Sequence, residues 1–250
     1  MRRITCVVLL IATTNAIYGQ GNTIRQHLVW YGLFSTLPLN EKWYLQNEFQ
    51  ERHFVDPVVQ HQLLTGSHIH RVLGKSGWET SLGISLSLQS PNEPNVSERL
   101  TVPELRPHIE FANKHKWGKV TIDHRYRAEA RFFHKTNTTG TALEDGLGFG
   151  SFRFRYRLQA TIPLYQFREN RYWKFKVSDE IHLNAANRIS KNVFEQNRIY
   201  GGLGYDIFQN LSVEVGCLNL YQQRPTGDFF NRNILRLTAF HKMSINKKNG

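Results

Sequence analysis

Arginine recurs at alternate positions in two segments of the chain, at 125, 127 and 131 with Glu at 129, and at 153, 155 and 157. Successive side chains of a β-strand point to opposite faces, so this spacing gathers the guanidinium groups on one face of each strand. Carboxylates share those faces, which makes a mixed basic and acidic ladder the main candidate for chemistry. The basic members are Arg106, Arg125, Arg127, Arg131, Arg153, Arg155 and Arg157, with Lys174 and Lys176, and the acidic members are Glu104, Glu110, Asp123, Glu129 and Glu180.

Two roles suit such a ladder if it faces the interior of a barrel. The charges could pair in a salt-bridge and hydrogen-bond network that fills a narrow lumen, because buried charges are expected to be paired. Alternatively, a basic lumen could attract an anionic solute. Nucleic-acid binding is not expected, although the formal net charge is +12. The arginines alternate with lipid-like Phe and Leu and leave no exposed basic face with stacking platforms.

Catalytic and metal-binding motifs are weak in this sequence. His68 and His70 lie two apart on one strand face, but no Cys or carboxylate cluster accompanies them at a recognisable ligand spacing. The chain has no G-x-S-x-G elbow and no H-E-x-x-H segment. We therefore predict no metal, no cofactor and no assigned catalytic residue. A Ser–His pair assembled from separate strands stays open as an alternative.

The elements that position these side chains show an apolar–polar alternation with a period of two. From Trp78 to Gln89, for example, the even-numbered residues are mostly apolar and the odd-numbered residues mostly polar, as in a strand between two environments. This pattern predicts an all-β fold, an antiparallel up-and-down transmembrane β-barrel of about 10–12 strands. The predicted strands are 25–37, 42–54, 58–72, 78–89, 102–114, 119–134, 150–164, 172–184, 195–207, 211–223 and 231–245.

These segments number eleven, whereas bacterial barrels have an even number of strands. A ten- or twelve-stranded barrel is therefore expected, with one segment misassigned or the first stretch outside the closed sheet. Short turns alternate with longer polar loops, at 90–101, 135–148, 185–194 and 224–230. Aromatic residues gather near the short turns and predict a girdle at one membrane interface. Its candidate members are Trp43, Trp78, Trp117, Trp173 and Tyr172.

The N-terminus has the pattern of an export signal. Arg2 and Arg3 precede a short apolar stretch and a small-residue cleavage region that ends at Gly19. The apolar stretch is shorter than the roughly 20 residues that a membrane-spanning helix needs. We predict a cleaved signal peptide at 1–19 and a barrel domain at 20–250, located in a bacterial outer membrane.

Several segments together resemble the DUF2490 family, outer-membrane β-barrel proteins of unknown function that are common in Bacteroidetes. They are Trp30 in an early strand, Trp43–Glu48 leading to Glu51-Arg52, Pro103–Pro107, and the basic strands His124–Arg127 and Arg153–Arg157. The resemblance implies a fold and a location, and it supplies no substrate or active site.

These observations favour an outer-membrane barrel with a structural, adhesive or narrow-pore role and a basic, partly salt-bridged lumen. The expected partners are outer-membrane lipid, lipopolysaccharide and the barrel-insertion machinery. The alternative is an outer-membrane enzyme that acts on lipid or lipopolysaccharide, with a His close to a Ser or carboxylate at the barrel edge. A soluble β-sandwich or lipid carrier is disfavoured because the tryptophans gather at one set of turns.

Overall fold

The computed structural model describes residues 22–185 and 193–244, which form eleven strands. The predicted signal peptide at 1–19 lies outside the described residues. Each of the eleven predicted segments contains a strand. The strands are β1 (Thr23–Pro38), β2 (Trp43–Phe54), β3 (Gln60–Leu73), β4 (Trp78–Gln89), β5 (Val102–Trp117), β6 (Val120–Thr136), β7 (Leu143–Arg168), β8 (Arg171–Ala185), β9 (Phe194–Phe208), β10 (Leu211–Gln223) and β11 (Phe229–Lys242).

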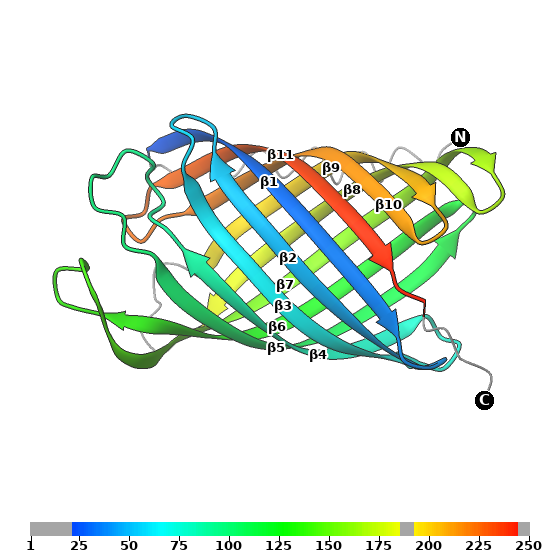
Figure 1. Cartoon of the computed structure of the whole chain (residues 1–250), viewed down its shortest axis with the longest axis horizontal. Coiled ribbons are helices and arrows are strands. Elements are labelled where there is room, and N and C mark those ends of the chain that lie inside the picture. Colours follow the sequence, from blue (N-terminus) through cyan, green and yellow to red (C-terminus); the bar gives the residue numbers. More distant parts are fainter. Residues whose placement is uncertain (1–21, 186–192, 245–250) are drawn as a thin grey trace.

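The strands close into one barrel in chain order (Figure 1). Chain neighbours pair antiparallel, and β1 closes the ring by pairing with β11 in parallel, from Thr23 opposite Phe229 to Thr36 opposite Lys242. An up-and-down barrel with an odd number of strands must contain one such parallel pair. The expected even number is therefore wrong, and the first segment joins the closed sheet. The parallel pairing of β1 with β11 explains why the barrel closes with an odd number of strands.

The predicted loop at 135–148 is also wrong in extent. β6 continues to Thr136 and β7 begins at Leu143, which leaves a loop of residues 137–142. Three glycines at 146, 148 and 150 favour a loop in the sequence, but the two strands keep pairing past two irregularities in register. Asn137 closes the loop, because its side-chain oxygen accepts hydrogen bonds from the backbone N–H groups of Thr141 (2.8 Å) and Ala142 (3.2 Å).

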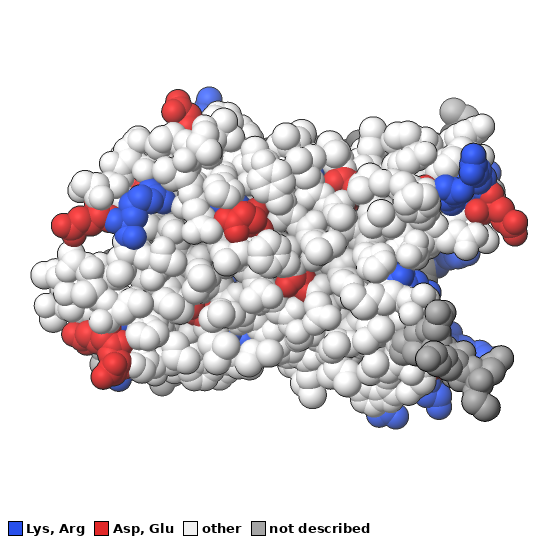
Figure 2. Space-filling model, in the orientation of Figure 1, with Lys and Arg blue, Asp and Glu red and all other residues white. Residues whose placement is uncertain are grey.

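The two faces of the sheet differ in polarity as the alternation predicts. On β7, Phe152 and Phe154 are each 50% exposed on the outer face, while Arg153 between them is buried inside. Figure 2 shows the outer surface mostly uncharged over the middle of the barrel, with a few patches of Asp and Glu there and with Lys and Arg mainly towards its two ends. The described residues contain no helix that is long and apolar enough to cross a membrane.

The two ends of the barrel carry different connections. All short turns, 39–42, 74–77, 118–119, 169–170 and 209–210, lie at one end, and the longer loops lie at the other (Figure 1). We call them the turn end and the loop end. Because β1 and β11 are parallel, β1 begins at the loop end and β11 finishes at the turn end.

The predicted aromatic positions lie at the turn end. Trp43 and Trp78 begin β2 and β4, Trp117 finishes β5, and Trp173 is the third residue of β8. Three of them, at 78, 117 and 173, are more than 40% exposed. Tyr172 differs, because strand alternation places it on the inner face with Lys174, whose Nζ lies 5.9 Å from the tyrosine ring centroid. Tyr172 therefore does not face outward with its neighbour Trp173.

Candidate functional site in the barrel lumen

The lumen contains a polar cavity of about 320 Å³. It is lined by side chains from every strand of the barrel, because each strand turns alternate residues inward. Of the predicted lumen residues, Arg106, Arg125, Arg127, Arg153, Arg155, Arg157, Glu110, Glu129 and Glu180 line this cavity. Asp123 and Lys176 of the predicted ladder also line it, Lys174 pairs instead with Asp206, and Glu104 and Arg131 are hydrogen-bonded to each other at 2.5 Å.

Ion pairs join these side chains across β5 to β8. Glu129 accepts a hydrogen bond from Arg155 at 2.7 Å and a longer one from Arg153 at 3.4 Å. Glu180 on β8 receives Arg125 at 2.5 Å and Arg155 at 2.8 Å. Arg125, Arg153 and Arg155 therefore each contact carboxylates on two different strands. We call this set of inward arginines and carboxylates on β5–β8 the Arg–Glu network.

The network extends at both ends through further pairs. Towards the turn end, Glu110 accepts a hydrogen bond from Arg127 at 2.7 Å. Towards the loop end, Glu195 at the start of β9 accepts hydrogen bonds from Arg131 at 3.1 Å and Arg153 at 2.5 Å. Glu195 was not predicted as a site residue. An irregularity in the pairing of β8 with the start of β9 places its side chain on the inner face, where it pairs with these two arginines.

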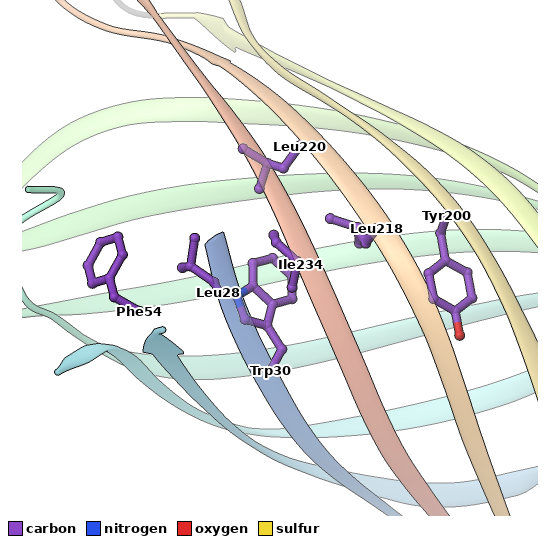
Figure 3. Close-up of a cluster of buried hydrophobic side chains, with 7 residues drawn as sticks. All are labelled: Leu28, Trp30, Phe54, Tyr200, Leu218, Leu220 and Ile234. Atoms are coloured by element: carbon purple, nitrogen blue, oxygen red, sulfur yellow. The ribbon is translucent and has the colours of Figure 1, made fainter. Parts of the chain in front are cut away.

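An apolar wall faces the network from the other side of the lumen. Leu28, Trp30, Phe54, Tyr200, Leu218, Leu220 and Ile234 form one buried cluster on the inner side of β1, β2 and β9–β11 (Figure 3). The Arg52 guanidinium lies 3.9 Å from the Trp30 ring centroid, a cation–π contact that covers the indole. The sequence did not indicate this wall, because β1 is apolar on both faces and its alternation gives no contrast.

The loop at 90–101 covers the lumen at the loop end, and we call it the cap. The side-chain oxygen of Asn92 accepts a hydrogen bond from Arg232 on β11 at 3.0 Å and lies 3.2 Å from the His61 ring on β3. Its backbone oxygen accepts a hydrogen bond from Gln26 on β1 at 2.9 Å. The cap starts from β4, and these contacts join it to the neighbouring β3 and to β1 and β11, three and four strands away around the ring.

Exposure within the lumen rises from the loop end to the turn end. Along β7, the side chain of Arg153 is 6% exposed, that of Arg155 is 13% and that of Arg157 is 25%. At the turn end Lys114 reaches 58%. At the loop end Arg232 is only 2% exposed. Among the described residues, the lumen side chains are therefore most enclosed at the loop end and most exposed at the turn end.

The two predicted histidines lie inside the barrel and join a third. Nδ1 of His68 lies 2.9 Å from Nε2 of His108, and the other ring nitrogen of His68 lies 3.3 Å from a carboxylate oxygen of Glu48. His70 stacks on Tyr44 with ring centroids 4.4 Å apart. Across residues 22–185 and 193–244, no group of three or more ligands has the arrangement of a metal site. The histidines are part of the polar packing of the lumen.

Several inward charged residues were missed by sequence reasoning. They are Glu48, Arg52, Glu195, Arg198, Glu214, Arg232 and Arg236. Except for Glu195, each occupies an alternate position with other inward polar or aromatic residues, as in the series Gln196, Arg198, Tyr200. That spacing was present in the sequence. It was less visible than the arginine runs because each strand carries only one or two charges.

Comparisons with known proteins agree with the barrel architecture. The family described as "Protein of unknown function (DUF2490)" matches residues 28–231. The chain matches none of the curated proteins at a significant level. Among solved structures, it is similar to a NanC porin, with a TM-score of 0.51 and 11% identity over 86% of this chain and 99% of that chain. LpxR from Salmonella typhimurium gives a TM-score of 0.43 and 9% identity, over 78% of this chain and 83% of that chain. The porin match supports the barrel fold alone. Because the family match extends over most of the sequence, the chain belongs to the DUF2490 family of proteins of unknown function.

Proposed function

We propose that this protein is an outer-membrane β-barrel with a structural or adhesive role and a lumen that does not conduct solutes across the membrane. The observation that carries the proposal is the cap at the loop end, which is hydrogen-bonded to β1, β3 and β11 through Asn92. A through-pore needs a continuous water path between both ends. The exposure gradient along the lumen supports a path from one end only.

The outer surface supports a membrane location. Its middle is largely uncharged, and the exposed tryptophans lie at the turn end, where a bilayer interface would be. A closed barrel leaves no unpaired strand edge, which a bilayer-spanning sheet requires. In this arrangement the turn end faces the periplasm and the cap faces the cell exterior. Membrane lipid, lipopolysaccharide and the barrel-insertion machinery are the partners that the location implies.

Packing of the lumen supports the structural role. Beneath the cap, Arg52 and Trp30 stack on one side and the Arg–Glu network fills the other. Charges that are hydrogen-bonded across strands in a desolvated interior restrain the strands that they join. The network therefore holds the β5–β8 wall at a fixed distance from the apolar wall and supports the loops that the barrel displays.

Two measurements test the proposal. The mature protein, residues 20–250, should fractionate with outer membranes and migrate differently on gels before and after boiling. Recovery as a soluble periplasmic monomer would contradict the membrane location. Proteoliposomes that contain the refolded protein should swell in small sugars no faster than empty liposomes, whereas liposomes with an open porin should swell. Swelling at the porin rate would contradict the closed lumen.

One observation favours a second candidate, an enzyme that acts on lipid or lipopolysaccharide. On the outer face of β2 near the loop end, Nε2 of His53 lies 2.9 Å from Oε1 of Glu51, and Gln60 donates a hydrogen bond to the same oxygen at 2.7 Å. A carboxylate that orients an imidazole in this way is the arrangement of a general base. If this pair is catalytic, His53→Gln should change the lipid A profile of cells as deletion of the whole protein does. An unchanged profile in the deletion strain would eliminate this candidate.

A further inference from the structure

Two arginines that line the cavity differ from all the others. Arg198 on β9 and Arg236 on β11 have no carboxylate within 4 Å and make no side-chain hydrogen bond with any part of the chain that the structure describes. Nε of Arg198 is buried without a partner. A buried donor without an acceptor is unfavourable, so Arg198 points to an acceptor that the described residues do not provide, and Arg236 lines the same cavity without a bonded partner among them.

Aromatic rings hold both guanidinium groups in position. Cζ of Arg198 lies 5.5 Å from the Trp30 ring centroid, and Cζ of Arg236 lies 5.3 Å from that of Tyr200. Such contacts fix a planar guanidinium while leaving its N–H groups free to donate. The two arginines are therefore oriented in the absence of an anionic partner.

The Tyr200 ring is itself fixed by the wall of the barrel. A side chain at Gly216 would place its Cβ 2.5 Å from the Tyr200 hydroxyl, so glycine at this position is what allows the ring to lie against β10. The hydroxyl donates a hydrogen bond to Glu214 at 2.7 Å, and Glu214 also accepts one from Lys176. Glu214 is the one carboxylate among the cavity-lining residues of β9–β11. Its close contacts are Tyr200 and Lys176, and neither Arg198 nor Arg236 lies within 4 Å of its carboxylate.

The cavity as a whole has an excess of positive charge. Eleven Lys and Arg side chains line it against seven Asp and Glu side chains, a surplus of four positive charges. In a cleft with low-dielectric walls, a surplus of one sign concentrates the field and attracts ions of the opposite sign. The lining residues of β5–β8 carry most of this surplus, and β9–β11 add one positive charge, with Arg198 and Arg236 against Glu214.

We propose that Arg198 and Arg236 form a binding site for a small soluble oxyanion, of the phosphate or carboxylate class, that enters from the turn end. Guanidinium groups match such oxyanions through paired N–H donors. The cavity of about 320 Å³ suits a small soluble anion. It opens at the turn end rather than through the barrel wall, so a lipid acyl chain has no route into it. The proposal rests on the proposed one-ended lumen and adds a ligand to it.

Equilibrium dialysis of radiolabelled inorganic phosphate against the refolded mature protein, in a phosphate-free detergent, tests the site. The wild type should bind about one phosphate per chain saturably, with chloride at the same ionic strength as the reference. Arg198→Gln and Arg236→Gln should each weaken binding by about tenfold or more, the effect expected for loss of a charge-assisted hydrogen bond. Arg25→Gln removes a charge from the exposed outer face of β1 and should leave binding unchanged.

The outcomes separate this inference from the proposed function. Heat-modifiable migration of each variant shows that the barrel is folded, which is expected because neither arginine is paired. Absence of saturable phosphate binding to the wild type, or wild-type affinity in both Gln variants, would overturn the site whether or not the lumen conducts. Arginine-dependent binding in a barrel that conducts would uphold the site and overturn the closed lumen.

Discussion

Glu129 is the residue whose loss should most disturb the Arg–Glu network. Its side chain is 2% exposed, and its carboxylate lies 2.7 Å from Arg155, 3.4 Å from Arg153 and 3.6 Å from Arg127. Glu129→Gln keeps the shape of the side chain and removes its charge. Removing one partner of a buried ion pair destabilises proteins by about 3–5 kcal/mol. Each of these arginines keeps a second carboxylate, so we expect the lower end, about 3 kcal/mol.

Equilibrium unfolding by urea in lipid vesicles measures this effect. A loss of about 3 kcal/mol lowers the equilibrium constant for folding by roughly 100-fold. Because the network is buried, added NaCl should change the difference little. Glu144→Gln, on the exposed start of β7, is the matched control and should leave the free energy of unfolding almost unchanged. A Glu129→Gln barrel as stable as the wild type would refute the view that the network is desolvated and structural.

Three further outcomes are expected. Asn92→Ala removes the side-chain acceptor that ties the cap to β3 and β11, and should lower the free energy of unfolding by about 1–3 kcal/mol. Asn95→Ala in the same loop is the control and should leave it unchanged. Equal urea midpoints for the two variants would contradict the contact. Gly77→Ala should destabilise the barrel more than Gly118→Ala, as measured by thermal unfolding. Both glycines have positive φ, but a Cβ at Gly77 would lie 2.2 Å from a backbone oxygen, whereas a Cβ at Gly118 would meet open space. The Cys217 thiol, exposed on the outer face of β10, should react in membranes with a lipid-soluble maleimide and not with a charged one; rapid reaction with the charged reagent would place it outside the bilayer.

The barrel fold was predictable because its physical cause is local. Alternation with a period of two is recorded in every strand where one face meets an apolar environment and the other a polar one, as on β4 and β7. The number of strands could not be settled in this way. Whether β1 pairs with β11 depends on contacts between residues about 206 positions apart, such as Thr23 and Phe229, and no local pattern records them.

The candidate site was predictable only in part. The arginine runs on β6 and β7 stand out since each strand repeats one charge several times. Trp30 was the tryptophan that did not fit the girdle, and the structure shows why: it lies inside the lumen beneath Arg52. The cap could not be predicted, because its hydrogen bonds join a polar loop of ordinary composition to distant strands. Arg198 and Arg236 stand out only because no described residue pairs with them through a hydrogen bond or an ion pair, and a sequence does not show which charges are paired.

Single-channel conductance of the refolded mature protein in a planar bilayer tests the central claim most directly. The closed loop end predicts folded, inserted protein without steady current at any applied voltage below membrane breakdown. Steady current would contradict the account. If that current were also selective for anions, the positive lumen would be a conducting path rather than a one-ended cavity.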